Sequence, residues 1–299
     1  MEAVTGAAGR TVKAIIYGDF GKTIGRQTVK HLLTRKTCAN CIMRIPAPRE
    51  KKSLIPAPMP QNRWVSQTVG CLMPNTNVRE FFRYIKEGRQ EKVEHLLRST
   101  PSLIHERENG LSSTLFAAYN NQPKLANFLA EKAVALNIFE AAATGRTNSI
   151  VLILARDPQL VNAYSDDGYQ PLGLACFFGN YETAQYLINA GARLNSPSQN
   201  RMRATPLHSA AAGGHAKLVL LLLEHGADPN ALQAGGLTPL HAAAQKGDLE
   251  SIRALLFHGA DSDIQSNECK TALNYAMERK NTRAVSLLKE KITKRLRSW

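Results

Sequence analysis

A six-residue motif that recurs at a fixed interval constrains the fold of this chain more than any other feature. Residues 238–243 read Thr-Pro-Leu-His-Ala-Ala, and residues 205–210, 33 positions earlier, read Thr-Pro-Leu-His-Ser-Ala. Residues 270–276 and 169–175 keep part of the pattern at nearly the same interval, with two extra residues in the connection 196–203. A period of about 33 residues is typical of a repeat protein, in which each unit is one small supersecondary element.

The residues of one period predict two short helices that need neighbours to be stable. Thr238 suits an N-cap, Pro239 suits the first helical position, and Gly247 suits the left-handed residue that ends a helix. A second helix follows, and its apolar face holds Leu249, Ile252, Leu255 and Leu256. A single unit cannot bury its apolar sides alone, so at least three units must stack.

Three weaker copies precede the clear ones. Partial matches at 81–97, 109–118 and 138–146 extend the array to about seven units over residues 77–290. These residues resemble the ankyrin repeat family. Their sequence resembles that of prokaryotic members more than that of metazoan ones. The resemblance implies an all-α fold, an ankyrin-repeat α-solenoid of about seven helix-turn-helix units with short β-turn fingers.

The domain boundaries follow from the repeats and from the charge. We expect the ankyrin repeat domain over 76–290, with weak units at 77–164 and clear units at 165–290. The net charge of +14 comes from the two ends, with +9 in residues 1–75, −2 in residues 76–278 and +7 in residues 279–299.

The N-terminal segment reads as a basic, Pro-rich, largely disordered leader, because it combines dense proline with charge and has no apolar face. A basic start poor in acidic residues also resembles an organelle transit peptide. We expect residues 291–299 to form a basic C-terminal extension of the last helix.

The sequence predicts no catalytic residue, no cofactor and no metal site. It lacks a nucleophile elbow, a P-loop and a dinucleotide-binding glycine motif. His208 and His241 hold the fourth place of the motif, and we interpret them as neutral side chains bonded to the backbone of the next finger. Cys38 and Cys41 lack two further ligands nearby, so a zinc site there would need a second chain.

The resemblance implies that a protein partner binds the finger tips and the exposed edge of the first helices, which line a concave groove. The positions that vary between units while the scaffold stays fixed are the candidates. The expected partner-binding residues are Tyr169, Phe178, Arg201, Met202, Leu237, Gln245, Lys246, Lys270 and Arg279.

Five of the variable positions are expected to form one anchor cluster of aromatic, arginine and methionine side chains, the composition of interface hot spots. They are Tyr169, Phe177, Phe178, Arg201 and Met202. One alternative stays open, in which Phe177 packs between repeats and only Phe178 is exposed. Arg203 stands where the neighbouring units have glycine, so this finger should be reshaped.

The sequence therefore favours a non-enzymatic, monomeric protein–protein interaction module without a small-molecule substrate. The alternative is an adaptor tethered to nucleic acid or an anionic membrane through its basic termini, with binding that falls steeply as salt rises. We expect a cytoplasmic location, since the five cysteines are odd in number and no signal-peptide core is present, with organelle targeting as the second choice.

Overall fold

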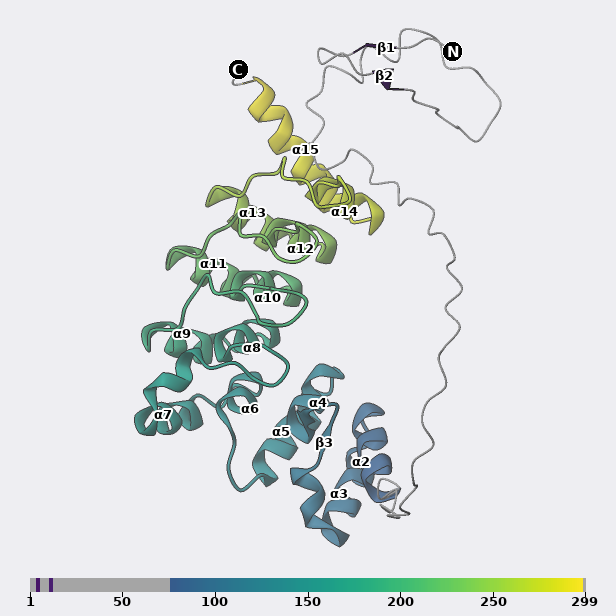
Figure 1. The fold of residues 1–299 in the computed structure, drawn as a ribbon, viewed down its shortest axis with the longest axis vertical. Helices are drawn as coiled ribbons and strands as arrows, with labels where there is room; N and C mark the ends of the chain where they lie inside the picture. The colour runs from purple at the N-terminus through teal and green to yellow at the C-terminus, as the bar shows by residue number, and fades with distance from the viewer. Residues whose placement is uncertain (1–3, 6–10, 13–75, 298–299) are drawn as a thin grey trace, which may run out of the picture. The chain divides into compact units, whose positions relative to one another are not determined.

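The computed structural model describes residues 76–297, with side chains to residue 290, and two short N-terminal strands. These strands, β1 (Val4–Thr5) and β2 (Thr11–Val12), pair antiparallel. The expectations for the rest of residues 1–75 lie outside the described residues. Within residues 76–297 the helices form seven consecutive pairs in one stack (Figure 1). The predicted all-α solenoid of about seven units is confirmed.

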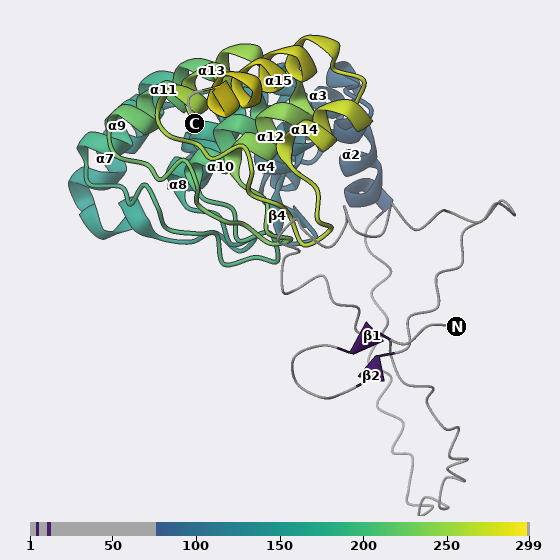
Figure 2. The ribbon, with the colours of Figure 1, turned by 90° about the horizontal axis from the view of Figure 1, so that it is seen from above.

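Each pair has a first helix and a second helix. The first helices are α2 (Thr76–Lys86), α4 (Ser113–Tyr119), α6 (Ile138–Ala143), α8 (Pro171–Phe178), α10 (Pro206–Gly213), α12 (Pro239–Lys246) and α14 (Ala272–Glu278). The second helices are α3 (Gln90–Ser99), α5 (Pro123–Lys132), α7 (Thr147–Arg156), α9 (Tyr181–Asn189), α11 (Ala216–Glu224), α13 (Leu249–Phe257) and α15 (Thr282–Arg297). Figure 2 shows the second helices α7, α9, α11 and α13 in one row beside the first helices α8, α10, α12 and α14.

The repeated motif forms the start of each clear first helix. Thr238 is the N-cap of α12, and its hydroxyl lies 2.8 Å from Nδ1 of His241. The backbone N–H of Thr238 donates to the same Nδ1 at 3.1 Å, so this nitrogen is an acceptor. Nε2–H of His241 then donates to the carbonyl of Lys270 in the next unit at 3.1 Å. The interpretation of the motif histidines as neutral ties between repeats is confirmed.

Each of the last four units opens with a finger, a loop closed by one backbone hydrogen bond ahead of the first helix. In the fourth unit Ser165 N donates to Tyr169 O, and the sixth and seventh units keep this four-residue spacing. In the fifth unit Ser198 N donates to Ala204 O, so the two inserted residues enlarge the finger. Arg203 adopts a left-handed φ of +50° there. The predicted reshaping of this finger is observed.

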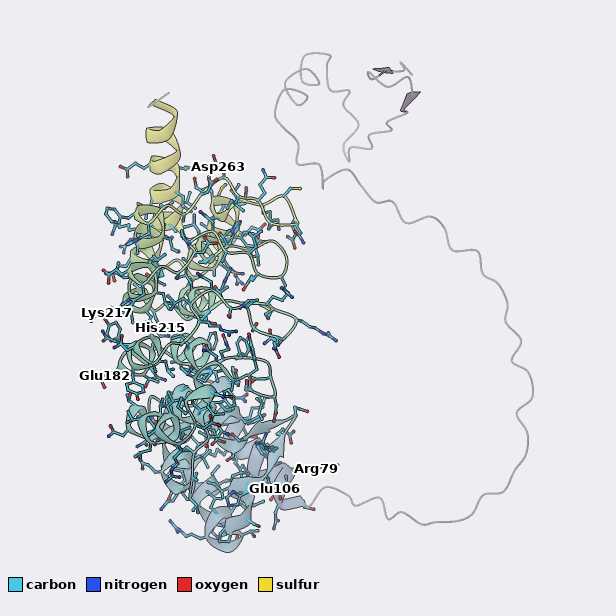
Figure 3. All side chains as sticks on the ribbon, turned by 60° about the vertical axis from the view of Figure 1, so that its left-hand side comes forward. Arg79, Glu106, Glu182, His215, Lys217 and Asp263 are labelled. Atoms are coloured by element: carbon cyan, nitrogen blue, oxygen red, sulfur yellow. The ribbon has the colours of Figure 1, made fainter. Side chains whose placement is uncertain are left out.

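Single backbone bonds also join one finger to the next, and the fingers project from one side of the stack (Figure 3). These bonds run from Gln199 N to Gly168 O, from Ala234 N to Met202 O and from Asn267 N to Gly235 O, at 2.8 to 2.9 Å. The second unit has a small hairpin at the same place, built from β3 (Arg107–Glu108) and β4 (Leu111–Ser112). Two 3-10 turns, η2 (Pro101–His105) and η3 (Pro158–Asn162), follow α3 and α7.

The buried side chains form two cores. The smaller core belongs to the first two units, between Phe81 and Leu129, and the larger core runs from Ile138 to Leu288. The connection from α5 to α6 passes through Val134, whose side chain is 92% exposed. Phe178 of α8 packs against both cores, so it joins them across this boundary.

Two further features concern the state of two cysteines and whether any described helix could span a membrane. Cys176 is a buried free thiol, and burial raises its pKa. Cys269 is disulfide-bonded. Among the described helices, none combines the length and the apolar character that a membrane span requires.

Candidate partner-binding groove

A groove of about 420 Å³ runs across the C-terminal ends of the first helices α4, α6, α8, α10 and α12. Small and aromatic side chains form most of its wall, and no aspartate or glutamate lines it among the described residues. Its lining includes Tyr119, Phe177, Phe178, Gly213, His215 and Lys246. We call this feature the groove.

Three aromatic rings form one wall of the groove. The ring centroid of Tyr119 lies 5.4 Å from that of Phe178 and 6.4 Å from that of Phe177. The two phenylalanine rings meet edge to face at 5.1 Å. The Tyr119 hydroxyl donates to Oδ2 of Asp167 at 2.6 Å, and burial together with this bond raises the Tyr119 pKa. The hydroxyl is therefore occupied, and the three rings contribute apolar surface to the groove.

The exposure of the two phenylalanines is opposite to the alternative drawn from the sequence. Phe177 is 40% exposed at the end of α8, whereas Phe178 is half-buried between the two cores. The sequence shows only that two rings stand together at a helix end. The rotation of α8 about its own axis and the gap between the second and third units decide which of the two rings is buried.

A glycine in the wall of the groove lets two repeats approach each other closely. By repeat spacing, Gly213 occupies the place that Phe178, Lys246 and Arg279 hold in other units. A Cβ on Gly213 would lie 2.5 Å from Cδ2 of His215 and 2.6 Å from the carbonyl oxygen of Phe177. His215, the N-cap of α11, bonds through Nε2 to that same carbonyl at 3.0 Å. Any larger residue at 213 would displace this contact between repeats.

Lys246 supplies the positive charge of the groove. Its side chain is exposed, and its aliphatic stem lies over Gly214, where a Cβ would meet Cε at 2.9 Å. Its ammonium group makes no ion pair among the described residues. A stem packed on glycine with a free charged end leaves the ammonium available to a partner.

The residues of the anchor cluster expected from the sequence lie at both ends of α8. Tyr169 precedes this eight-residue helix, and Phe177 is its second-last residue. Arg201 and Met202 stand exposed on the enlarged finger, on the side of Tyr169. Fingers lie at the N-terminal ends of the first helices and the rings at the C-terminal ends. Tyr119 connects the two ends, because its ring contacts Phe177 and Phe178 and its hydroxyl bonds Asp167 of the finger. The five residues as one partner-binding cluster stay a prediction.

The remaining predicted positions divide in the same way. Leu237 and Lys270 belong to fingers, where their carbonyls accept from His208 and His241. The ammonium of Lys270 is paired with Glu268 and Glu278, at 2.9 and 2.8 Å. Gln245 and Arg279 are exposed near the ends of α12 and α14. Of the nine predicted residues, only Phe178 and Lys246 line the groove.

Comparison with known proteins identifies the repeats. A model described as ankyrin repeats in three copies matches residues 138–233, and a second, for many copies, matches residues 222–276. The chain is 43% identical over 74 residues to "Ankyrin repeat and KH domain-containing protein mask" of Drosophila melanogaster, covering 25% of this chain and 2% of that protein.

Two further relatives are similar over longer segments. "Target of rapamycin complex 2 subunit AVO2" of Saccharomyces cerevisiae is 28% identical over 166 residues, covering 51% of this chain and 38% of that protein. "Ankyrin repeat and SOCS box protein 3" of Homo sapiens is 37% identical over 79 residues, covering 26% and 15%. The chain matches well under two thirds of each relative's length. All three relatives are eukaryotic, and the likeness to prokaryotic members stays a prediction.

The helix pairs, the fingers and the capping motif agree with these matches. The first family model begins at Ile138, which is also where the larger core begins. Residues 138–276 of this chain are therefore ankyrin repeats.

Proposed function

We propose that the chain is a non-enzymatic protein-binding module that holds a segment of a protein partner in the groove. Ankyrin repeats are generally protein–protein interaction modules, and the yeast relative is by name a subunit of a complex. The observation that carries the proposal is the groove itself. It crosses five units and combines an exposed aromatic ring, a residue type that interfaces favour, with a free cation.

Affinity capture with matched variants tests the proposal. Phe177→Ala with Lys246→Ala removes the exposed ring and the charge of the groove. Leu152→Ala with Lys217→Ala is the control, because both residues are exposed on second helices. Figure 3 shows Lys217 on the side away from the fingers. We expect the groove variant to lose partners that the wild type and the control retain, at an unchanged melting temperature.

The same captured set from all three proteins would contradict the groove as the binding site. Loss of partners in the control variant alone would move the site to the second helices.

The charged ends support a second candidate function. Residues 1–75 and 279–299 carry +9 and +7, which favours a tether to nucleic acid or an anionic membrane. Such binding should fall steeply between about 50 and 200 mM salt and vanish when residues 1–75 and 291–299 are removed. Binding that resists salt would exclude this function. The cytoplasmic location and the monomeric state remain proposals of the same kind.

A further inference from the structure

We propose that a slot between the second and fourth units holds an extended, basic segment of a partner protein, in the place of a finger that the third unit lacks. The slot lies between the hairpin β3–β4, the start of α6 and the fourth finger, residues 165–169. It shares no lining residue with the groove. The proposal therefore adds a second binding site, and it can fail separately from the proposed function.

The third unit has no finger because its connection is short. The connection from α5 to α6 consists of residues 133–137, whereas the connections into α8 and α12 are residues 157–170 and 225–238. Residues 133–137 pass directly into the capping box at the start of α6 and make none of the closing bonds that shape the fingers. The row of fingers is therefore interrupted between the hairpin and the fourth finger.

The interruption leaves one backbone donor of the row without an acceptor. In the fifth, sixth and seventh fingers the second residue donates its N–H to the preceding finger, and these donors are Gln199, Ala234 and Asn267. The second residue of the fourth finger is Asp166, and its N–H makes no hydrogen bond to another described residue. A partner segment in the slot would supply the missing carbonyl, in the way that a free strand edge recruits a further strand.

The size and the wall of the slot suit one extended segment. Its volume is about 240 Å³, below the range of about 300 Å³ and more that is usual for small-molecule sites. Leu115 is buried in its wall, and Leu111 and Phe139 are half-buried there. Successive side chains of an extended segment point to opposite faces. One apolar side chain would therefore contact this wall, and the residues before and after it would point towards the rim.

The charge around the slot is negative. The hairpin with its preceding residue, residues 106–112, and the fourth finger contain four carboxylates and one cation, namely Glu106, Glu108, Asp166, Asp167 and Arg107. Asp167 accepts from the hydroxyls of Tyr119 and Ser165, and these neutral donors leave its charge in place. The rim therefore favours lysine or arginine on both sides of the apolar residue.

The cations near the slot do not cancel this charge. Arg107 spans the slot, because Nη1 donates to the carbonyl of Gly110 at 3.1 Å and to Oδ2 of Asp166 at 2.6 Å. Both side chains of this ion pair are more than half exposed, so the pair contributes little to stability and a basic partner residue can replace Arg107. Arg201 and Arg203 belong to the fifth finger, on the other side of the fourth finger from the slot, and form no ion pair with a described carboxylate.

Selection from a random peptide library displayed on phage, with the full chain as bait, tests the proposal. We expect enriched peptides in which an apolar residue stands between two lysines or arginines. Fluorescence polarisation then measures their affinity for each variant. Glu108→Gln should weaken binding about threefold. The control Glu182→Gln makes the same change on a second helix, on the side away from the fingers (Figure 3), and should leave the affinity unchanged.

Two variants at Asp166 isolate its backbone N–H. The bond from Gly168 N to Ser165 O closes a four-residue turn with Asp166 at its second position, where proline is favoured. Asp166→Ala removes only the carboxylate, whereas Asp166→Pro removes the N–H as well. We expect Asp166→Pro to bind the peptides about fivefold more weakly than Asp166→Ala, at the same melting temperature. Ala234→Pro removes an N–H that bonds Met202 O, so it should lower the melting temperature.

The outcomes separate the slot from the groove. Equal affinities of Asp166→Ala and Asp166→Pro would overturn the slot as the place of a missing finger. A melting temperature that Asp166→Pro lowers as far as Ala234→Pro does would also overturn it, because the N–H would then already have an acceptor in this chain. Peptides that depend on Asp166 but carry no basic residue would overturn the basic ligand. Peptides that depend only on Phe177 and Lys246, or a selection without enrichment, would overturn the slot, and the first of these results would keep the groove.

Discussion

Acid should destabilise this protein through His208, which the repeat stack holds in its neutral form. The side chain is 1% exposed, and burial lowers its pKa to about 4 from an ordinary 6.5, with the nearby His241 adding to the effect. Nδ1 faces the backbone N–H and the hydroxyl of Thr205, and Nε2–H donates to the carbonyl of Leu237. A proton on Nδ1 would point at the N–H of Thr205. The fold therefore disfavours the charged imidazole.

The sign and size of the effect follow from these pKa values. The folded pKa of His208 lies below the unfolded one, so the unfolded chain takes up the proton first as pH falls. The stability is complete above about pH 6.5 and is lost as pH falls towards 4. The full difference corresponds to about 3 kcal/mol, of which about 2 kcal/mol is lost between pH 7.5 and pH 5.

His208→Asn isolates this contribution, because the last unit already has asparagine at the same place. There Oδ1 of Asn274 accepts from the backbone N–H of Thr271 at 2.9 Å, so the capping motif survives the change. The variant loses the bond to Leu237, which should cost about 1 to 2 kcal/mol at pH 7.5. It no longer titrates, so between pH 7.5 and pH 5 it should lose about 2 kcal/mol less than the wild type.

Urea denaturation followed by circular dichroism at the two pH values measures the difference. The comparison is internal, since all other titrating groups are shared by both proteins. Equal losses of unfolding free energy in wild type and variant would refute the assignment of the pH effect to His208.

Three further changes test the fold. Phe178→Ala removes the side chain that packs on both cores. It should lower the free energy of unfolding by about 2 kcal/mol and split urea unfolding into two transitions. A single transition would contradict separate cores. Arg203→Gly relieves the backbone strain of a left-handed conformation at φ +50°. The free energy of unfolding should rise by about 1 kcal/mol. A lower melting temperature would contradict this reasoning. Asn180→Ala removes two hydrogen bonds to the carbonyls of Ala142 and Ala143. Urea denaturation should show a free energy of unfolding lower by about 1 to 3 kcal/mol. An unchanged value would mean that solvent replaces these bonds.

The elements that could be predicted from the sequence are those fixed by local chemistry. The capping place of Thr238, the helix end at Gly247 and the reshaped finger at Arg203 each depend on residues within one unit. The period then positions them in every copy. Local rules therefore predicted the repeat architecture well.

The groove depends on side-chain contacts between neighbouring units, and the 33-residue period alone does not specify these contacts. Two adjacent rings at the end of α8 look equivalent in sequence, yet Phe178 fills the space between two cores and Phe177 stays exposed. The nine predicted partner-binding residues did not include Tyr119, Gly213 and His215, which line the groove. A signal for Gly213 existed, since alignment by the period places it where other units have Phe178, Lys246 and Arg279.

The departures from the repeat are concentrated in the fifth unit, and this bears on where a partner binds. Its finger is two residues longer, Arg203 holds a left-handed conformation and Gly213 occupies a helical position. A left-handed arginine and a helical glycine each cost about 1 kcal/mol. The sixth unit shows that the same scaffold can be built without them, with Gly236 and Lys246 at the matching places. Gly213 has a structural reason, the contact of His215 with the Phe177 carbonyl, whereas the longer finger with Arg203 has none within the stack. Local rules are broken most often where function requires it, so the finger of the fifth unit is the departure that favours a role in binding.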